Sequence, residues 1–218
     1  MRSVLRAAAL SAVAMSTFVV ASAANAGFVY QSSAREVSVS VSGSVVDSES
    51  STAFGGWFGD ASVNTSSYVG LATQGSGLDA LEMSFVGAAQ LNASSPANLN
   101  ARSVATVVFQ SNATESLRWI ASLAREAVGS NNNASIAFSV TEIDTGAILL
   151  AFSGPSNGAG SFDVVAGRSY RVAISAIANA TGATNALANY NVGVFSTVPA
   201  PGAIALLGLA GLTGRRRR

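Results

Sequence analysis

The sequence predicts an all-β protein in which residues 27–197 form an antiparallel β-sandwich of the jelly-roll kind. Segments in which apolar and polar residues alternate recur along this part of the chain, and such alternation is the pattern of a half-buried strand. Turn sequences that contain glycine separate several of these segments, as tight hairpins require. The segments follow one another roughly every ten residues, a spacing typical of sandwiches and jelly rolls.

Residues 1–26 have the three parts of a secretory signal peptide. Arg2 and Arg6 supply the positive charge, residues 7–21 form the apolar stretch, and Ala24 and Ala26 occupy the small-residue positions of a cleavage site. We therefore expect export of the protein and cleavage after Ala26. The alternative is a retained N-terminal membrane anchor, for which the apolar stretch is shorter than the roughly 20 residues that a span needs.

Seven segments of the domain are predicted as strands. The clearest is 37–42, where valine and serine alternate without exception. The others are rich in β-branched and apolar residues and lie at 104–109, 135–143, 147–152, 161–165, 170–177 and 190–198.

Turn residues connect these predicted strands. Asp144-Thr145-Gly146 and Ala166-Gly167-Arg168 each place a glycine where a tight hairpin needs a positive φ. Segments 154–160 and 130–133 are rich in glycine, serine and asparagine, so both are predicted as loops.

Segment 115–128 fits two structures. As a helix it would have one apolar face and a stop signal at Gly129. As a strand it would alternate Leu117, Trp119 and Leu123 with polar residues, and only Ile120 would break the pattern. Because the neighbouring segments all have strand patterns, a strand over 116–123 is the favoured interpretation.

The composition excludes several functions. The chain of 218 residues contains no Cys, His or Lys, which removes disulfides, imidazole and thiolate metal sites, and nucleophile systems that depend on these residues. Residues 27–198 carry six arginines and all eleven acidic residues, a net charge of −5. A basic surface for nucleic acid is therefore not expected, and neither is a cofactor or a metal.

Two pairs of carboxylates are the remaining candidates for acid–base chemistry. Glu142 and Asp144 are two residues apart on a predicted strand and would face the same side, as the paired carboxylates of a glycosidase require. Asp79 and Glu82 lie three apart, in a helical turn or in a loop that leads into a strand. The favoured interpretation of both pairs is a solvated position in or beside a turn, so we predict that the protein is not an enzyme.

Trp57 is the candidate platform for a sugar. It lies in the sequence Phe54-Gly55-Gly56-Trp57-Phe58-Gly59, where the glycines would leave a ring accessible. An aromatic ring can stack on the apolar face of a sugar. The alternative, which we favour, is that Trp57 closes one end of the sandwich.

The C-terminus combines three features in a fixed order. Val198, Pro199, Ala200, Pro201 and Gly202 form an extended segment that cannot join a strand. Residues 203–213 are apolar but would make a helix only about 15–20 Å long, against a hydrocarbon core of about 30 Å. The four arginines Arg215, Arg216, Arg217 and Arg218 would keep the end of the chain in the cytoplasm.

This C-terminal segment resembles the PEP-CTERM sorting signal of bacterial exosortase substrates. In that family a Pro-x-Pro motif precedes an apolar segment and a terminal arginine cluster, and residues 198–218 have the same order. The chain departs from the usual motif at Ala200, where the family has glutamate. The resemblance implies transient retention in the inner membrane, recognition by an exosortase and cleavage near the motif. Members of the family are often linked to exopolysaccharide and biofilm production.

We therefore expect an exported, non-enzymatic protein of the cell surface or extracellular matrix. It would comprise a signal peptide (1–26), a β-sandwich domain (27–197) and a sorting signal (198–218) with a short transmembrane helix. Exosortase would be its processing partner, and the resemblance implies exopolysaccharide as a further one. A carbohydrate-binding module with Trp57 as platform is the first alternative, and a glycosidase using Glu142 and Asp144 is the second. A plain C-terminal tail anchor is the alternative to the sorting signal.

Overall fold

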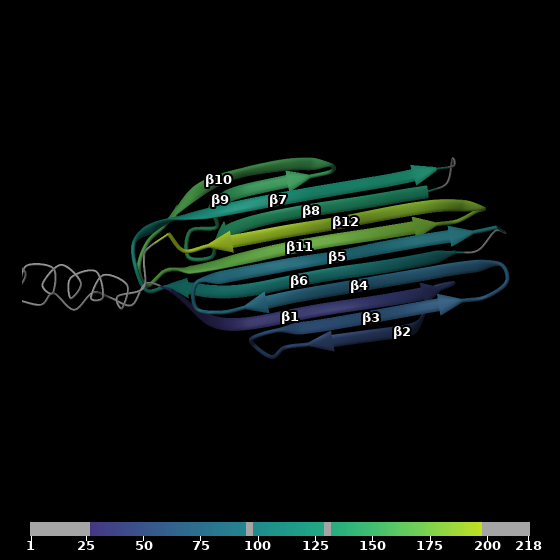
Figure 1. The fold of residues 1–218 in the computed structure, drawn as a ribbon, viewed down its shortest axis with the longest axis horizontal. Coiled ribbons are helices and arrows are strands. Elements are labelled where there is room, and N and C mark those ends of the chain that lie inside the picture. The colour runs from purple at the N-terminus through teal and green to yellow at the C-terminus, as the bar shows by residue number, and fades with distance from the viewer. Residues whose placement is uncertain (1–26, 95–97, 129–131, 198–218) are drawn as a thin grey trace, which may run out of the picture.

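The computed structural model describes residues 27–94, 98–128 and 132–197. They form twelve strands and, within these ranges, no helix. All of the strands run antiparallel to their neighbours in two sheets of six strands each, which pack face to face (Figure 1). The predicted all-β sandwich is thus confirmed for the described residues.

The two sheets are named here by their strand order. Sheet A has the order β2-β1-β6-β11-β8-β9, and sheet B has the order β10-β7-β12-β5-β4-β3. The strands of sheet A are β1 (Phe28–Val41), β2 (Ser44–Ser51), β6 (Leu99–Ser111), β8 (Asn132–Glu142), β9 (Ile148–Ser153) and β11 (Ser169–Ala180). Those of sheet B are β3 (Trp57–Asn64), β4 (Tyr68–Leu78), β5 (Glu82–Ala93), β7 (Glu115–Val128), β10 (Ser156–Val164) and β12 (Thr184–Phe195).

The last eight strands are nested as in a jelly roll. β8 pairs with β9, β7 with β10, β6 with β11 and β5 with β12, so strands β5 to β8 and β9 to β12 form one long two-stranded ribbon. Successive sections of this ribbon alternate between the two sheets, which gives the eight-stranded topology. Strands β1 to β4 then extend both sheets beside β5 and β6.

The core lies between the sheets and follows from the alternation in each strand. In β6 every second residue from Leu99 to Ser111 is buried, while most of the intervening residues are only partly covered. The largest fully buried apolar and aromatic side chains are Phe85, Met83, Leu91, Phe109, Leu117, Leu123, Phe138, Tyr170 and Tyr190. These residues and the twelve paired strands all lie within the described ranges.

The ambiguous segment 115–128 is strand β7, as favoured from the sequence. Leu117, Trp119, Ala121 and Leu123 point into the core, and Ile120 on the opposite face is 47% exposed. The helix alternative is wrong because the segment pairs along its length with β12 and β10, a ladder that the sequence of this segment alone does not reveal.

The predicted hairpin turns are confirmed. Gly146 and Gly167 have positive φ values of 71° and 79°, and they lie between β8 and β9 and between β10 and β11. A glycine adopts this conformation without the steric cost that a side chain would add.

The loop predicted over 154–160 is wrong for most of its length. Strand β10 begins at Ser156 and pairs with β7 through Gly158 and Gly160. The ring of Trp119 lies against both glycines. A Cβ added at Gly158 or at Gly160 would be only 3.1 Å from the nearest atom of that ring. Glycine here makes room for a buried tryptophan, although the composition indicates a loop. In the second predicted loop, 130–133, β8 already begins at Asn132.

Four strands had no clear sequence signal. β2 is mostly exposed and polar, and β3, β4 and β5 are interrupted by glycine or small residues. Their alternation was too weak to identify them, even though β2 pairs with β1, β3 with β4 and β4 with β5, all neighbours in the sequence.

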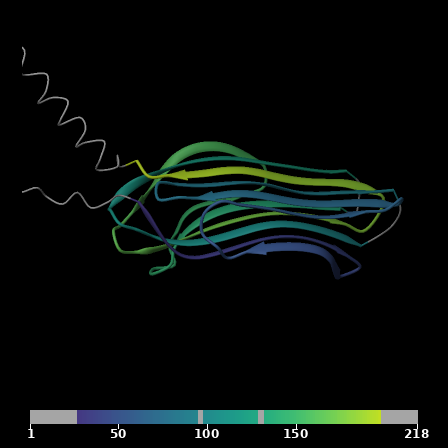
Figure 2. The same cartoon turned by 60° about the horizontal axis from the view of Figure 1, so that its bottom comes forward.

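The two ends of the domain meet at one pole of the sandwich. The backbone N–H of Phe28 donates to Ala80 O (2.8 Å), and that of Ser196 donates to Leu81 O (2.9 Å). The turn Asp79–Glu82 between β4 and β5 therefore holds both ends, and we call this end of the sandwich the near pole. Figure 2 shows both ends of the described chain at the same end of the molecule.

Several predictions fall on residues outside the described ranges. They are the signal peptide with Ala24 and Ala26, the motif 198–202, the apolar segment 203–213 and the arginines 215–218. Within the described ranges, no helix is long and apolar enough to cross a membrane.

Candidate functional site

Trp57, the predicted sugar platform, is only half exposed and faces inward at the start of β3. Its ring lies against Gly59, where a Cβ would be 2.3 Å from Trp57 Cζ2. The guanidinium carbon of Arg35 is 5.6 Å from the centre of the ring. The next residue, Phe58, points outward and is 69% exposed. The more accessible ring in this sequence is therefore that of Phe58.

Arg35 holds the loop that leads into β3. Its side chain is 1% exposed, and Nη1 donates to Gly55 O (3.0 Å) and Ser76 Oγ (2.9 Å) while Nη2 donates to Ala53 O. Loss of hydration on burial lowers the pKa of Arg35. In the described part of the chain no carboxylate forms an ion pair with Arg35. Backbone carbonyl and hydroxyl oxygens accept the hydrogen bonds of its guanidinium instead. The sequence does not predict this contact. Arg35 lies twenty residues before Gly55, and its neighbours in the sequence are mostly polar, so nothing marks its side chain as buried.

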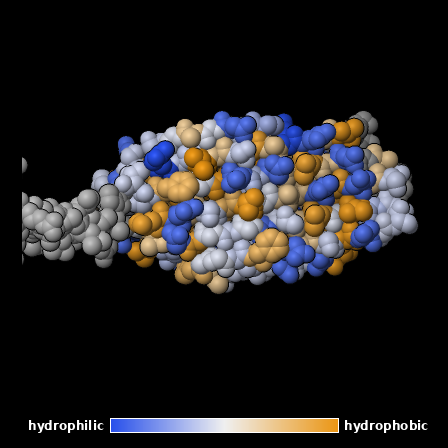
Figure 3. Space-filling view, viewed as in Figure 1, coloured by the Kyte–Doolittle hydropathy of each residue, from blue (hydrophilic) through white to orange (hydrophobic). Residues whose placement is uncertain are grey.

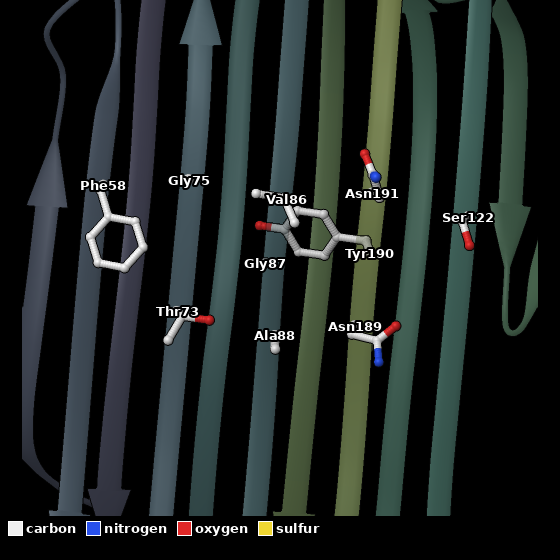
Figure 4. Close-up of a pocket in the computed structure, with 10 residues that line it drawn as sticks. All are labelled: Phe58, Thr73, Gly75, Val86, Gly87, Ala88, Ser122, Asn189, Tyr190 and Asn191. Atoms are coloured by element: carbon white, nitrogen blue, oxygen red, sulfur yellow. The ribbon is translucent and has the colours of Figure 1, made fainter.

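The outer face of sheet B carries a shallow groove of about 420 Å³. One row of residues crosses the middle of this face from strand to strand, and it runs Phe58, Gly75, Val86, Asn191, Ser122 and Asn157. The groove is lined by residues of this row and its neighbours (Figure 4): Phe58, Thr73, Gly75, Val86, Gly87, Ala88, Ser122, Asn189, Tyr190 and Asn191.

The groove forms in this row because Gly75 has no side chain. A Cβ at Gly75 would lie 3.2 Å from Val86 Cγ1 and 3.8 Å from Phe58 Cδ2, so the absent side chain leaves a gap between these two residues. Figure 4 shows Phe58 and Val86 on either side of Gly75, with Asn191 and Ser122 farther along the sheet. Backbone atoms, including those of Gly87, contribute to the floor of the groove.

The lining of the groove is uncharged. It combines one exposed aromatic ring, two side-chain amides and the hydroxyls of Thr73 and Ser122, and it contains no Asp, Glu or Arg. The hydroxyl of Tyr190, which also lines it, is bonded to Ser103 in the interior. Amides and hydroxyls both donate and accept hydrogen bonds, so the groove is suited to a neutral, hydroxyl-rich ligand rather than to an ion. On the side of the molecule seen in Figure 3, apolar and polar side chains are interspersed rather than gathered in one apolar patch.

Glu142 and Asp144 accept hydrogen bonds from residues of the turns at the near pole. Glu142 accepts hydrogen bonds from Arg168 Nη1 (2.5 Å) and Thr145 Oγ1 (2.8 Å), and Asp144 Oδ2 accepts one from the Ser169 N–H (3.1 Å). The hydrogen bond from Arg168, followed by the one from Thr145, lowers the pKa of Glu142. Both carboxylates are thus engaged with the chain itself.

Asp79 and Glu82 belong to the turn between β4 and β5. Asp79 Oδ1 accepts the N–H groups of Leu81 (2.9 Å) and Glu82 (2.8 Å), as an aspartate at the start of a turn commonly does. The structure thus realises the loop-into-strand interpretation of this segment. Among the described residues, no three acidic side chains come together as a metal site would need.

The chain was compared with protein-family models, with characterised proteins and with solved structures, and none of them matches it.

Proposed function

We propose that the protein is an exported, non-enzymatic component of the cell surface or extracellular matrix, delivered through a PEP-CTERM-like signal and processed by an exosortase. This proposal is supported by one observation: the first and last strands of the domain end close to the two processing sites that the sequence predicts. Strand β1 begins at Phe28 and strand β12 ends at Phe195, just inside the positions where the sequence places signal cleavage and the start of the sorting motif.

The last described residues are bonded to the body of the domain. Ser196 Oγ donates to Glu115 Oε2 (2.6 Å), the Thr197 N–H donates to the same oxygen (3.3 Å), and Thr197 Oγ1 donates to Ser116 O (2.9 Å). A protease needs an extended and accessible segment. Cleavage is therefore expected beyond Thr197, within or after the motif that begins at Val198.

The position of both chain ends at the near pole is compatible with transient anchoring in the membrane through the C-terminal segment. Both ends of the domain attach to the turn Asp79–Glu82, so a chain held at its C-terminus in the membrane would carry the near pole toward the bilayer. The rest of the sandwich would extend away from the membrane along its long axis. Removal of the terminal arginines would leave the domain with its net charge of −5, which suits release rather than adhesion to anionic lipid.

We expect the mature protein to begin at Gly27 and to lack Arg215–Arg218. Intact-mass measurement of the protein from wild-type cells and from cells without the exosortase tests this expectation. The wild-type form should end between Val198 and the apolar segment, whereas the form from the deletion strain should retain the arginines. If both strains yield a protein that retains them, the sorting proposal is wrong and a plain tail anchor replaces it.

A second candidate function is binding of a neutral polysaccharide to the groove on sheet B. The exposed ring of Phe58 beside the uncharged amides of Asn189 and Asn191 favours it. In this proposal Phe58 takes the stacking role that the sequence assigned to Trp57, while Trp57 supports the strand from inside.

Replacing Phe58 with alanine is expected to weaken polysaccharide binding about fivefold, because a stacking contact contributes about 1 kcal/mol. The probe is the purified exopolysaccharide of the producing cells, with binding followed by affinity electrophoresis or calorimetry. The free energy of unfolding should hardly change, since the Phe58 ring is mostly in solvent.

Phe54→Ala is the matched control for this experiment. Phe54 is also exposed, at 52%, but its ring stacks on Tyr30 (5.7 Å between centres) outside the groove. It should leave the affinity unchanged. Equal binding by the wild type and the Phe58 variant, or equal losses in the Phe58 and Phe54 variants, would remove the groove as the binding site.

A further inference from the structure

The two long sides of the sandwich end differently. On one side lie the edge strands β2 and β3. Two carboxylates of β2 accept backbone N–H groups of β3: Asp47 Oδ2 that of Ser62 (2.7 Å), and Glu49 Oε2 that of Asp60 (3.2 Å). Two backbone amides at this edge are thus occupied, and negative charge lies beside them. Both features discourage the addition of another strand.

The opposite side ends in β9 and β10 (Figure 1). β10 pairs with β7 along one side, and within the described ranges no strand or side chain is bonded to its other edge. The nine residues of β10 include one charged residue, Asp163, and no proline. β10 therefore lacks the charges and the prolines by which natural edge strands avoid further pairing.

β10 is nevertheless firmly positioned. The ring of Trp119 packs against Gly158 and Gly160, and Phe162 and Val164 are buried in the core. Behind it, Trp119 and Phe152 lie 5.1 Å apart between ring centres and close the interior on this side. The free edge is thus a preformed row of backbone donors and acceptors that needs no rearrangement to accept a partner strand.

We propose that β10 is the interface of a symmetric homodimer, in which two copies pair antiparallel and join their B sheets into one continuous sheet. The partner is a second copy of this chain because the outward side chains of β10 complement one another. With Gly160 on the two-fold axis, all nine residues pair. Asn157 then lies opposite Asp163 of the partner subunit, and Ala159 lies opposite Ser161 of the partner subunit.

This register is favoured over its neighbours by the same side chains. Asn157 and Asp163 are exposed, and their side chains make no hydrogen bond within the described residues. Residues directly opposite in an antiparallel pair have Cβ atoms about 4.5–5.5 Å apart, within reach of an amide-to-carboxylate hydrogen bond. Moving the axis by one residue puts Asp163 opposite Ala159 of the partner subunit and removes both bonds.

The other free edge, β9, is a poorer interface. It has six residues against nine, and its pairing with β8 contains an irregularity at Val140 and Thr141. Short edge strands and bulges are devices that limit edge pairing. β9 therefore provides a matched control on the same side of the molecule.

The experiment uses residues 27–197, which contain all twelve strands and the whole described core. Light scattering coupled to gel filtration, over a wide range of protein concentration, gives the dissociation constant of the wild-type dimer. Two double variants disturb the β10 interface: A159K/S161K and A159E/S161E. In the proposed register each places like charges directly opposite one another at two positions. The control A151K/S153K makes the same changes at β9, where Ala151 and Ser153 are also exposed.

We expect a concentration-dependent dimer for the wild type and for the β9 control. Each β10 double variant should raise the dissociation constant at least tenfold, and an equimolar mixture of the lysine and glutamate variants should dimerise again as a heterodimer. Circular dichroism should show the same strand content in every variant. A wild type that is monomeric at all concentrations, loss of the dimer in the β9 control, or a mixture that stays monomeric would each overturn the proposal.

Discussion

Replacing Trp119 with alanine should lower the free energy of unfolding by about 3–5 kcal/mol, the usual cost of deleting a large buried aromatic side chain. Trp119 is 8% exposed, and its ring contacts the rings of Phe152 and Phe138, with centres 5.1 and 6.5 Å away. It also covers Gly158 and Gly160 on β10. Because these glycines have no side chain of their own, nothing nearby can fill the cavity that the variant would leave.

Ile120→Ala is the control for this prediction. Ile120 is the next residue in β7 but faces the solvent side of sheet B, 47% exposed, so its loss should cost about 0.5 kcal/mol or less. Urea unfolding of residues 27–197 with both variants measures the difference. Comparable losses at the two positions would contradict the inward orientation of Trp119 and, with it, the placement of β10.

Replacing Gly87 with valine should destabilise the domain by about 3 kcal/mol or more, since overpacking a filled core costs about 1–3 kcal/mol and a buried hydrogen bond is lost as well. A Cβ at Gly87 would lie 2.5 Å from Tyr190 Cζ and Oη, and 2.7 Å from Ser103 Oγ. Ser103 Oγ donates to Thr73 O (2.9 Å), so Tyr190 Oη donates to Ser103 Oγ (2.9 Å). Burial raises the pKa of Tyr190 to about 12, which keeps its hydroxyl protonated as a donor at neutral pH.

The control for Gly87 is Gly75→Val on the outer face of the same sheet. There the added methyl groups would meet Val86 and Phe58 at the surface of the groove, where side chains can move aside. The free energy of unfolding should change by about 0.5 kcal/mol or less, measured by the same urea titrations. Similar stabilities of the Gly87 and Gly75 variants would show that Tyr190 does not occupy the space over Gly87.

The sequence alone was sufficient for the fold class, for most of β7, β8, β9 and β11, and for parts of β1, β6, β10 and β12. In these strands the inward-facing residues repeat with a period of two, as in Leu99 to Ser111 and Leu117 to Leu123. The hairpins at Gly146 and Gly167 were equally predictable, because the need for a positive φ in a tight turn is a property of a few adjacent residues.

For the candidate site, the sequence singled out a segment but did not show which of its two neighbouring rings is accessible. It singled out the glycine-rich stretch around Trp57, whereas the accessible ring belongs to Phe58. Neighbouring residues of a strand point to opposite faces. Which of the two faces is inside depends on Arg35 and Gly59, which receive the Trp57 ring, and on the position of β3 at the edge of sheet B.

Only the tertiary structure decided that β10 begins at Ser156 rather than near Ser161, and that β2 to β5 are strands. The composition of 154–160 indicates a loop, but Trp119 of another strand covers its glycines and β7 pairs with its backbone. Alternation and turn residues are local signals that a short window of sequence contains. The pairing partner of β10, the ring that fills the space at its glycines and the edge that remains open are set by residues tens of positions away, and they emerge only when the sheets assemble.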